Sequence, residues 1–223
     1  MIIGIDKGHS INGGAVGILN ETTENRKLGN RLIAMLKEKG HTVIDCSVDS
    51  ASSQNAQLSG IVKKANAQKL DLFVSIHFNT YGSGANGTEV FTTTTTSQAN
   101  KNKAKLMSEK IAASCGFRNR GHKTSSLYVI KNTIAPAMLV EVCFIDNQSD
   151  VSKYNMEKVA RAMFEVITGK AYVEPTPPKN PTTSGDVYYR VVAGSYKDRK
   201  NADDMVNKLK AQGISAFIDI YRK

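Results

Sequence analysis

The chain has 223 residues, of which 40% are hydrophobic, and it carries a formal net charge of +10 at pH 7. This hydrophobic content is enough for a packed core and excludes a globally disordered chain, and the length allows one domain of ordinary size with a smaller appendage. The positive charge favours a polyanionic partner, but charge alone leaves nucleic acid, an anionic membrane surface and an anionic cell wall open.

Short apolar segments rich in β-formers alternate with segments of helical periodicity over the first two-thirds of the chain. The expected strands are residues 1–6, 42–46, 70–76, 89–93, 127–130 and 137–142. The expected helices are residues 28–39, 58–65, 97–113 and 151–167. Strands with continuous apolar runs that alternate with helices are typical of a sheet covered on both faces. The pattern therefore predicts an α/β body.

A proline-rich stretch separates this body from a short tail. Four of the five prolines fall within residues 174–185, which lack apolar side chains and are typical of an extended linker. We expect a body over residues 1–170, a linker over 171–185 and a tail over 186–223. The tail predicts a βαβ unit with strands at 187–196 and 214–221 around a helix at 199–212. One such unit has too little core to be stable alone, so we expect it to dock on the body or on a second copy.

The cysteines and the N-terminus both favour an intracellular place of synthesis. Cys46, Cys115 and Cys143 are odd in number and form no CxxC pair, so we expect small buried side chains rather than disulfides. The first residues predict a strand rather than a basic and apolar leader, and no run is long enough to span a membrane. We therefore expect synthesis in the cytoplasm without a signal peptide.

Two of the four histidines follow or end predicted strands. His9 comes shortly after the first strand, and His77 comes at the end of the apolar run 72–76. Functional groups in open α/β sheets gather at the carboxyl ends of the strands, so these two imidazoles are expected to converge. His41 follows the glycine that ends a predicted helix and is expected to be a solvated turn residue.

Carboxylates complete a candidate metal site. A catalytic zinc ion takes three protein ligands and keeps one open position. Glu21 and Glu24 precede the helix at 28–39, although acidic residues are also common there because of the helix dipole. Glu141 lies in an apolar strand, where burial of a carboxylate is costly without a function. Spacing alone thus indicates a metal hydrolase and leaves the choice between Glu21 and Glu24 open.

Eight segments of the body, in order, resemble the zinc-dependent N-acetylmuramoyl-L-alanine amidases of bacterial autolysins and phage endolysins. The segments are residues 5–9, 14–17, 21–28, 72–79, 87–90, 119–121, 127–130 and 136–141. The resemblance implies a twisted, largely parallel sheet of about six strands between helices. It also implies hydrolysis of the amide bond between N-acetylmuramic acid and L-alanine in peptidoglycan.

The resemblance also assigns roles to four residues. It implies that His9, Glu21 and His77 bind Zn²⁺ and that Glu141 is the catalytic general base. Glu21 is preferred to Glu24 because the family's glutamate precedes an asparagine by four positions, as Glu21 precedes Asn25. His122 follows the family's Asn-Arg-Gly segment, and its role as a substrate contact or as a loop residue stays open.

The tail is similar to the first half of a SPOR domain, which binds peptidoglycan glycan strands. The similarity lies in residues 189–196 and in Asn201 and Ala202. It implies peptidoglycan as the partner, rather than nucleic acid or an inserted membrane segment. A half unit implies either a homodimer formed through the tail or a vestigial domain.

Two other functions stay open at this point. A zinc peptidase acting on wall peptides shares a similar sheet and ligand set, and a non-catalytic cell-wall-binding protein needs no catalytic centre. Without a leader, an amidase is expected to reach the wall by holin-mediated release, as an endolysin, or by mother-cell lysis, as a sporulation enzyme. The sequence leaves these two routes open.

Overall fold

The computed structural model describes residues 1–82, 84–174, 194–212, 214, 216–218 and 220. The chain divides into two compact units, Met1–Glu174 and Pro175–Lys223. Among the described residues, no helix combines the length and the apolar character needed to cross a bilayer.

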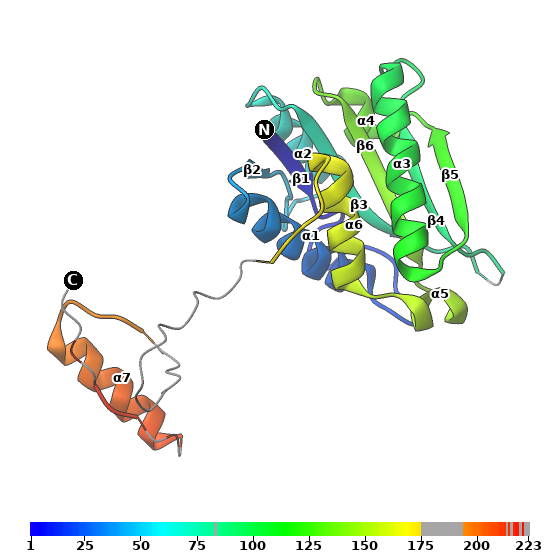
Figure 1. The fold of residues 1–223 in the computed structure, drawn as a ribbon. Helices are drawn as coiled ribbons and strands as arrows, with labels where there is room; N and C mark the ends of the chain where they lie inside the picture. Colours follow the sequence, from blue (N-terminus) through cyan, green and yellow to red (C-terminus); the bar gives the residue numbers. More distant parts are fainter. Residues whose placement is uncertain (83, 175–193, 213, 215, 219, 221–223) are drawn as a thin grey trace, which may run out of the picture. The chain divides into compact units, whose positions relative to one another are not determined.

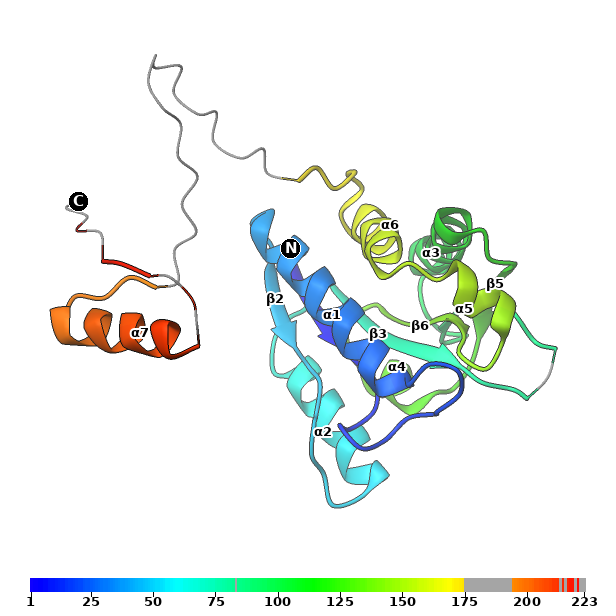
Figure 2. The same ribbon diagram turned by 90° about the horizontal axis from the view of Figure 1, so that it is seen from below.

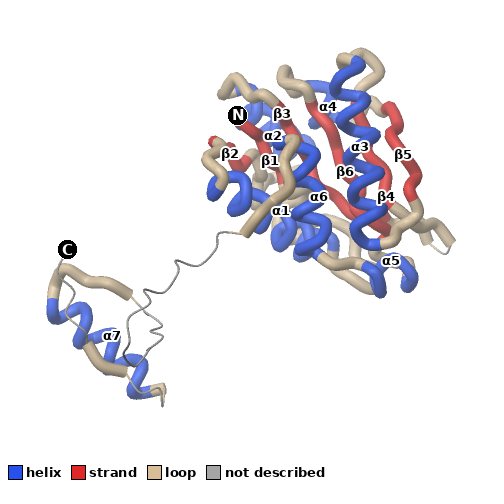
Figure 3. Tube along the Cα trace, viewed as in Figure 1, coloured by secondary structure: helices blue, strands red, loops and turns tan. Residues whose placement is uncertain are grey.

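The first unit is built on a six-stranded sheet with the strand order β2-β1-β3-β6-β4-β5 (Figures 1 and 3). The strands are β1 (Ile2–Asp6), β2 (Thr42–Asp45), β3 (Leu72–Asn79), β4 (Thr88–Thr92), β5 (Asn119–Thr124) and β6 (Ala137–Phe144). Neighbouring strands run parallel except β4 and β6, which are antiparallel. The predicted α/β fold with a largely parallel sheet of about six strands is confirmed.

Helices cover both faces of the sheet (Figure 2). One face carries α1 (Glu21–Glu38), α3 (Gln98–Cys115) and α6 (Met156–Thr168), and the other carries α2 (Gln54–Asn66) and the short α4 (Tyr128–Asn132). The larger core lies under the three long helices and includes Leu28, Met107 and Met163. The smaller core lies under α2 and α4 and includes Phe73 and Leu139.

Helix α1 begins at Glu21, earlier than the apolar periodicity from Leu28 predicts. The side chain of Asn20 accepts a hydrogen bond from the Thr23 N–H at 2.9 Å and caps the helix, which satisfies one of the unpaired donors of the first turn. The buried residues of these first turns are polar, so they give no hydrophobic period. As a result, the N-terminal end of α1 places Glu21 in the interior.

The prediction of a strand at 127–130 is wrong, because these residues lie at the start of α4 or within it. Val129 and Ile130 pack into the smaller core, and Thr133 Oγ1 donates to the Val129 carbonyl at 2.7 Å at the end of the helix. The sixth strand is instead β5, with the sequence Asn-Arg-Gly-His-Lys-Thr. Among the described strands it pairs only with β4, at the edge of the sheet. Its side chains are polar, so a search for apolar runs does not find it.

The helix predicted at 151–167 is divided into α5 (Gln148–Lys153) and α6. Asn155 interrupts it, because its side chain accepts from the Lys158 N–H at 3.0 Å and starts a new helix.

The second unit contains α7 (Arg199–Ala211), which confirms the predicted tail helix. Residues 194–196, 214, 216–218 and 220 form no strand, and the remainder of the two strands predicted in the tail lies outside the described residues. Most of the expected linker at 171–185 also lies outside them.

Candidate active site

His9 and His77 come from neighbouring parallel strands at the same edge of the sheet. His9 follows β1, and His77 is near the end of β3, where the register with β6 shifts between His77 and Asn79. Their ring centroids are 4.8 Å apart, with the rings nearly perpendicular at 79°. The structure thus brings the two histidines together.

Glu21 lies between these two rings and is almost fully buried. Its Oε2 is 3.1 Å from His9 Nε2, and its Oε1 is 3.1 Å from His77 Nδ1. The backbone N–H groups of Ala15 and Phe78 also donate to this carboxylate, at 2.8 and 3.1 Å. Four contacts therefore fix the position of the Glu21 carboxylate.

These contacts decide the charge of the cluster. Burial alone would raise the pKa of Glu21, but hydrogen bonds with His77 and His9 outweigh burial and hold the pKa well below its usual range. Burial opposes a charge on His77, but the hydrogen bond with Glu21 and the nearby carboxylates outweigh burial and raise the pKa of His77 to about 9. Without a metal, the ionised Glu21 carboxylate therefore favours the protonated form of His77, and a bound cation would replace that proton and its charge.

The donor set fits a zinc ion. One ligand atom from each of His9, Glu21 and His77 lies within 4.8 Å of the others. Two imidazole nitrogens and a carboxylate are a known ligand set of catalytic zinc, which keeps a fourth position for water or substrate. Glu24, the alternative to Glu21, lies outside the cluster, and its Oε1 accepts from Lys27 Nζ at 2.8 Å.

Glu141 lies beside this donor set on β6. It is the register partner of His77 on β3. Its Oε2 atom is shielded from solvent and has no hydrogen-bond partner among the described residues. Burial raises the pKa of Glu141 to about 7, with a further increase from Glu21 and Glu89 that His77 opposes. Such a carboxylate exchanges a proton near neutral pH.

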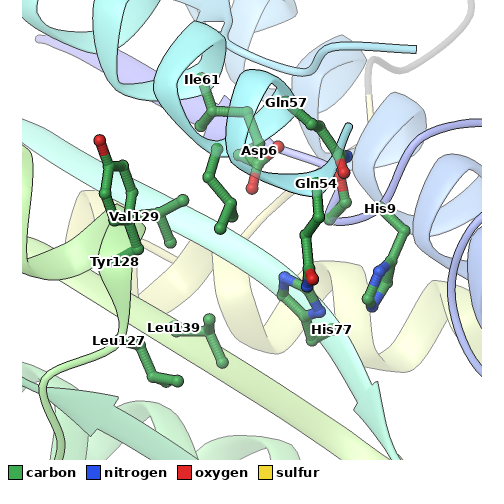
Figure 4. Close-up of a pocket in the computed structure, with 12 residues that line it drawn as sticks. Asp6, His9, Gln54, Gln57, Ile61, His77, Leu127, Tyr128, Val129 and Leu139 are labelled. Carbon is green, nitrogen blue, oxygen red and sulfur yellow. The ribbon is translucent and has the colours of Figure 1, made fainter. Parts of the chain in front are cut away.

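A pocket of about 180 Å³ opens beside the two histidines, between the sheet and helices α2 and α4 (Figure 4). Leu58, Ile61, Val129 and Leu139 give it an apolar lining, and further lining residues are Asp6, Gly8, His9, Gln54, Gln57, His77, Leu127 and Tyr128. Sequence reasoning missed the contribution of α2, because glutamines near the start of a helix carry no distinctive signal.

Arg26 of α1 holds the loop that carries His9. Its guanidinium donates to the carbonyls of Lys7 and His9 at 2.9 and 2.6 Å, and to Asp49 at 2.6 Å. Sequence reasoning missed this residue as well. Helix α1 therefore supplies Glu21 and also fixes the loop of the first histidine.

The other histidines and the cysteines lie outside the cluster. His122 is the register partner of Val90, whose side chain is in the larger core, so it lies on the opposite face of the sheet from Glu141. Its Nε2 is 2.8 Å from Thr92 Oγ1. His41 lies in the turn between α1 and β2. The three cysteines are free thiols; those at positions 46 and 143 are buried, and the third is half-buried.

A family model described as N-acetylmuramoyl-L-alanine amidase matches residues 3–169. The chain belongs to this family. A SPOR domain model matches residues 151–219, so its first part overlaps α5 and α6 of the amidase unit.

Individual amidases support this membership. The chain is 38% identical over 170 residues to the N-acetylmuramoyl-L-alanine amidase LytC of Bacillus subtilis, with 72% of this chain and 34% of that protein covered. It is 28% identical over 220 residues to the sporulation-specific N-acetylmuramoyl-L-alanine amidase of Bacillus subtilis, with 96% and 82% covered. The solved catalytic domain of the CD27L endolysin targeting Clostridia Difficile matches with a TM-score of 0.69 and 28% identity, over 77% of this chain and 98% of that one.

The chain is short beside several relatives. It spans between 34% and 55% of the length of the first three curated relatives that it matches.

Proposed function

We propose that this chain hydrolyses the amide bond between N-acetylmuramic acid and the L-alanine of the peptidoglycan stem peptide. The observation that carries the proposal is the placement of Glu141 next to the donor set of His9, Glu21 and His77. Its Oε2 is shielded from solvent and has no hydrogen-bond partner in the part of the chain that the structure describes. Membership of the amidase family supports the choice of this bond.

In this proposal His9, Glu21 and His77 hold a zinc ion. When bound, zinc supplies a Lewis acid that polarises a carbonyl group and lowers the pKa of water. Glu141 accepts a proton from the attacking water at its carboxylate and returns the proton to the nitrogen of the leaving L-alanine. Burial raises the pKa of Glu141, which favours the uptake of a proton by this carboxylate.

Peptidoglycan is also the proposed partner of the second unit. The SPOR domain match over residues 151–219 supports binding of glycan strands. The single βαβ unit that the tail sequence predicts would have little core, which supports the further proposal of a homodimer through the tail. Light scattering on the full chain tests the dimer, because it distinguishes one copy from two.

Similarity to an endolysin and to a sporulation-specific amidase supports release through a holin pore or by mother-cell lysis. The neighbouring genes test this choice. A holin gene indicates an endolysin, and spore-coat or cortex genes indicate a sporulation enzyme.

Mass spectrometry of purified cell walls treated with the protein tests the reaction. The proposal expects intact stem peptides with free L-alanine amino groups, together with glycan strands that lack peptides. Shortened stem peptides would instead indicate a wall peptidase. Binding to walls without any released product would indicate a non-catalytic wall-binding protein.

A further inference from the structure

A second cluster of charged side chains lies next to Glu141, and its interpretation rests on the proposed function. Glu89 on β4 is the antiparallel register partner of Glu141 on β6. Register partners project to the same side of a sheet, with Cβ atoms about 5 Å apart. Arg120 and Lys123 of β5 reach this carboxylate from the edge of the sheet.

The oxygens of Glu89 are already engaged. Oε1 accepts from Asn79 Nδ2 at 2.9 Å, and Oε2 accepts from Arg120 Nε at 2.6 Å and from Lys123 Nζ. Burial would raise the pKa of Glu89, but the hydrogen bonds from the two cations outweigh burial and lower the pKa. Glu89 therefore stays ionised and holds the two cations rather than acting as a second acid or base.

Two cations share one carboxylate, so the cluster carries an excess positive charge. The two cationic side chains are more exposed to solvent than the carboxylate. The side chains of Arg120 and Lys123 are 25% and 40% exposed, while that of Glu89 is 5% exposed. The Nη1 of Arg120 donates to the Asn86 carbonyl at 3.4 Å, and its Nη2 has no acceptor within the described residues. The pair thus presents donors and positive charge to a ligand.

The strand order sets the order in which these groups lie along the sheet. The candidate zinc ligands follow β1 and end β3, the proposed base is on β6, Glu89 is on β4 and the two cations are on β5. Because the base protonates the leaving amine, the amine lies at Glu141. Seen from Glu141, β4 and β5 lie on the opposite side from β3 and β1, so a peptide that extends in this direction meets the two cations.

We propose that Arg120 and Lys123 form a subsite for a carboxylate of the stem peptide, namely the free α-carboxylate of its second residue. That residue is D-glutamate joined through its γ-carboxyl group, so its α-carboxylate is free unless the wall carries a carboxamide there. The carboxylate lies about 7 Å from the scissile nitrogen, roughly two residue lengths. The strand β4, where the two cations bind Glu89, lies about 4.8 Å beyond β6, which is shorter than this reach.

The chemistry of the pair distinguishes the two forms of the second residue. A guanidinium binds a carboxylate through charge-assisted hydrogen bonds, whereas a carboxamide offers one neutral oxygen and no charge. Because the cations are partly exposed to water, we expect a preference for the carboxylate of about tenfold in kcat/KM rather than more.

The experiment uses the full chain with zinc and two muramyl tripeptides that end in L-lysine amide. They differ only in an α-carboxylate or an α-carboxamide on the second residue, and they compete in one reaction followed by mass spectrometry. The wild type is expected to prefer the carboxylate form. Lys123→Met and Arg120→Met are each expected to reduce the kcat/KM ratio toward one.

Lys110→Met is the matched control. Lys110 has a similar exposure of 42% and pairs with Glu165 at 2.7 Å on helices α3 and α6, so its loss should keep the wild-type ratio. A ratio measured in competition does not depend on the fraction of folded enzyme, because both peptides compete for the same active molecules.

Three outcomes would overturn the subsite. These are equal kcat/KM for the two peptides in the wild type, a preference for the carboxamide, and an unchanged ratio in the Arg120→Met/Lys123→Met double variant. Hydrolysis of neither peptide would contradict the proposed amidase function, and the subsite with it.

Discussion

Glu21 and Glu24 lie in the first turn of α1, less than one helical turn apart, but they face different partners. Glu21 contacts both histidines, and Glu24 accepts from Lys27 at 2.8 Å. Glu21→Gln should therefore lower the affinity for zinc by about 100-fold or more, because a ligand and its charge are lost.

Glu24→Gln is the control, since it makes the same chemical change outside the cluster. Zinc titration of both variants by calorimetry checks the prediction. Equal zinc affinity of Glu21→Gln and the wild type would remove Glu21 from the ligand set.

Glu89 gives a pH-dependent prediction about stability. Its folded-state pKa lies below its ordinary value of 4.5, so the ionised group stabilises the fold above that pH. The stabilisation is lost as the pH falls through the lowered pKa. Glu89→Gln should cost about 1–2 kcal/mol of unfolding free energy at pH 7, discounted for the exposure of its two cationic partners.

Urea unfolding at pH 7 and at pH 3.5 measures this effect. The difference between the wild type and Glu89→Gln should shrink at the lower pH. Glu165→Gln, which removes the exposed pair with Lys110, should change stability by less than about 0.5 kcal/mol at either pH. A cost of Glu89→Gln that is the same at both pH values would contradict the account.

Single residues also show how far the sequence could predict the site. The apolar runs of β3 and β6 mark His77 and Glu141, because a polar group that ends or interrupts such a run is costly without a role. Arg26, Arg120 and Lys123 could not be found in this way. Their importance depends on partners far away in the sequence, and surface cations carry no periodic signal.

At the scale of elements, the structure differs from the sequence-based expectation where local propensity and tertiary packing disagree. The segment Leu-Tyr-Val-Ile at 127–130 has strand-forming side chains, but Val129 and Ile130 fill the smaller core from a helix. The polar edge strand β5 forms because β4 offers it an edge for backbone pairing. Its own side chains do not predict a strand, so β5 depends on the rest of the sheet.

The turn after β1 positions His9 and tolerates only glycine at position 8. Gly8 has φ +65°, and a Cβ there would lie 2.6 Å from Asn25 Nδ2 and 2.8 Å from the Ile76 carbonyl. Gly8→Ala should therefore lower the unfolding free energy by about 3 kcal/mol or more, because strain and a clash add together. It should also weaken zinc binding, because His9 is the next residue.

Gly40→Ala is the matched control. Gly40 has φ +80° with no atom within 4 Å of a Cβ, so its replacement adds backbone strain without a clash. Its expected cost is about 1 kcal/mol, with zinc affinity unchanged. Urea unfolding and calorimetry check both variants, and equal costs at the two positions would contradict the packing argument for Gly8.

At the scale of the whole molecule, we expect the first unit to carry out hydrolysis and the second unit to bind the cell wall. The first unit holds both hydrophobic cores and the candidate site, and the SPOR match extends into the second. A chain that ends at Glu174 should still hydrolyse a soluble muramyl peptide at close to the rate of the full chain. It should sediment less with purified walls, as measured by a pelleting assay at increasing salt.

Equal sedimentation of the truncated and full chains would contradict a role of the tail in wall binding. Sedimentation of both should fall with salt, because attraction between a basic protein and an anionic wall is screened.

In the proposed function, Glu141 performs the chemistry while His9, Glu21 and His77 hold the metal. Zinc content and release of L-alanine amino groups from purified walls, measured on the same preparation of Glu141→Ala, test it most directly. We expect one zinc ion per chain, as in the wild type, with a loss of activity of about 100-fold or more. Full activity of Glu141→Ala would show that Glu141 is not the base, and loss of its zinc together with its activity would show that it helps to hold the metal.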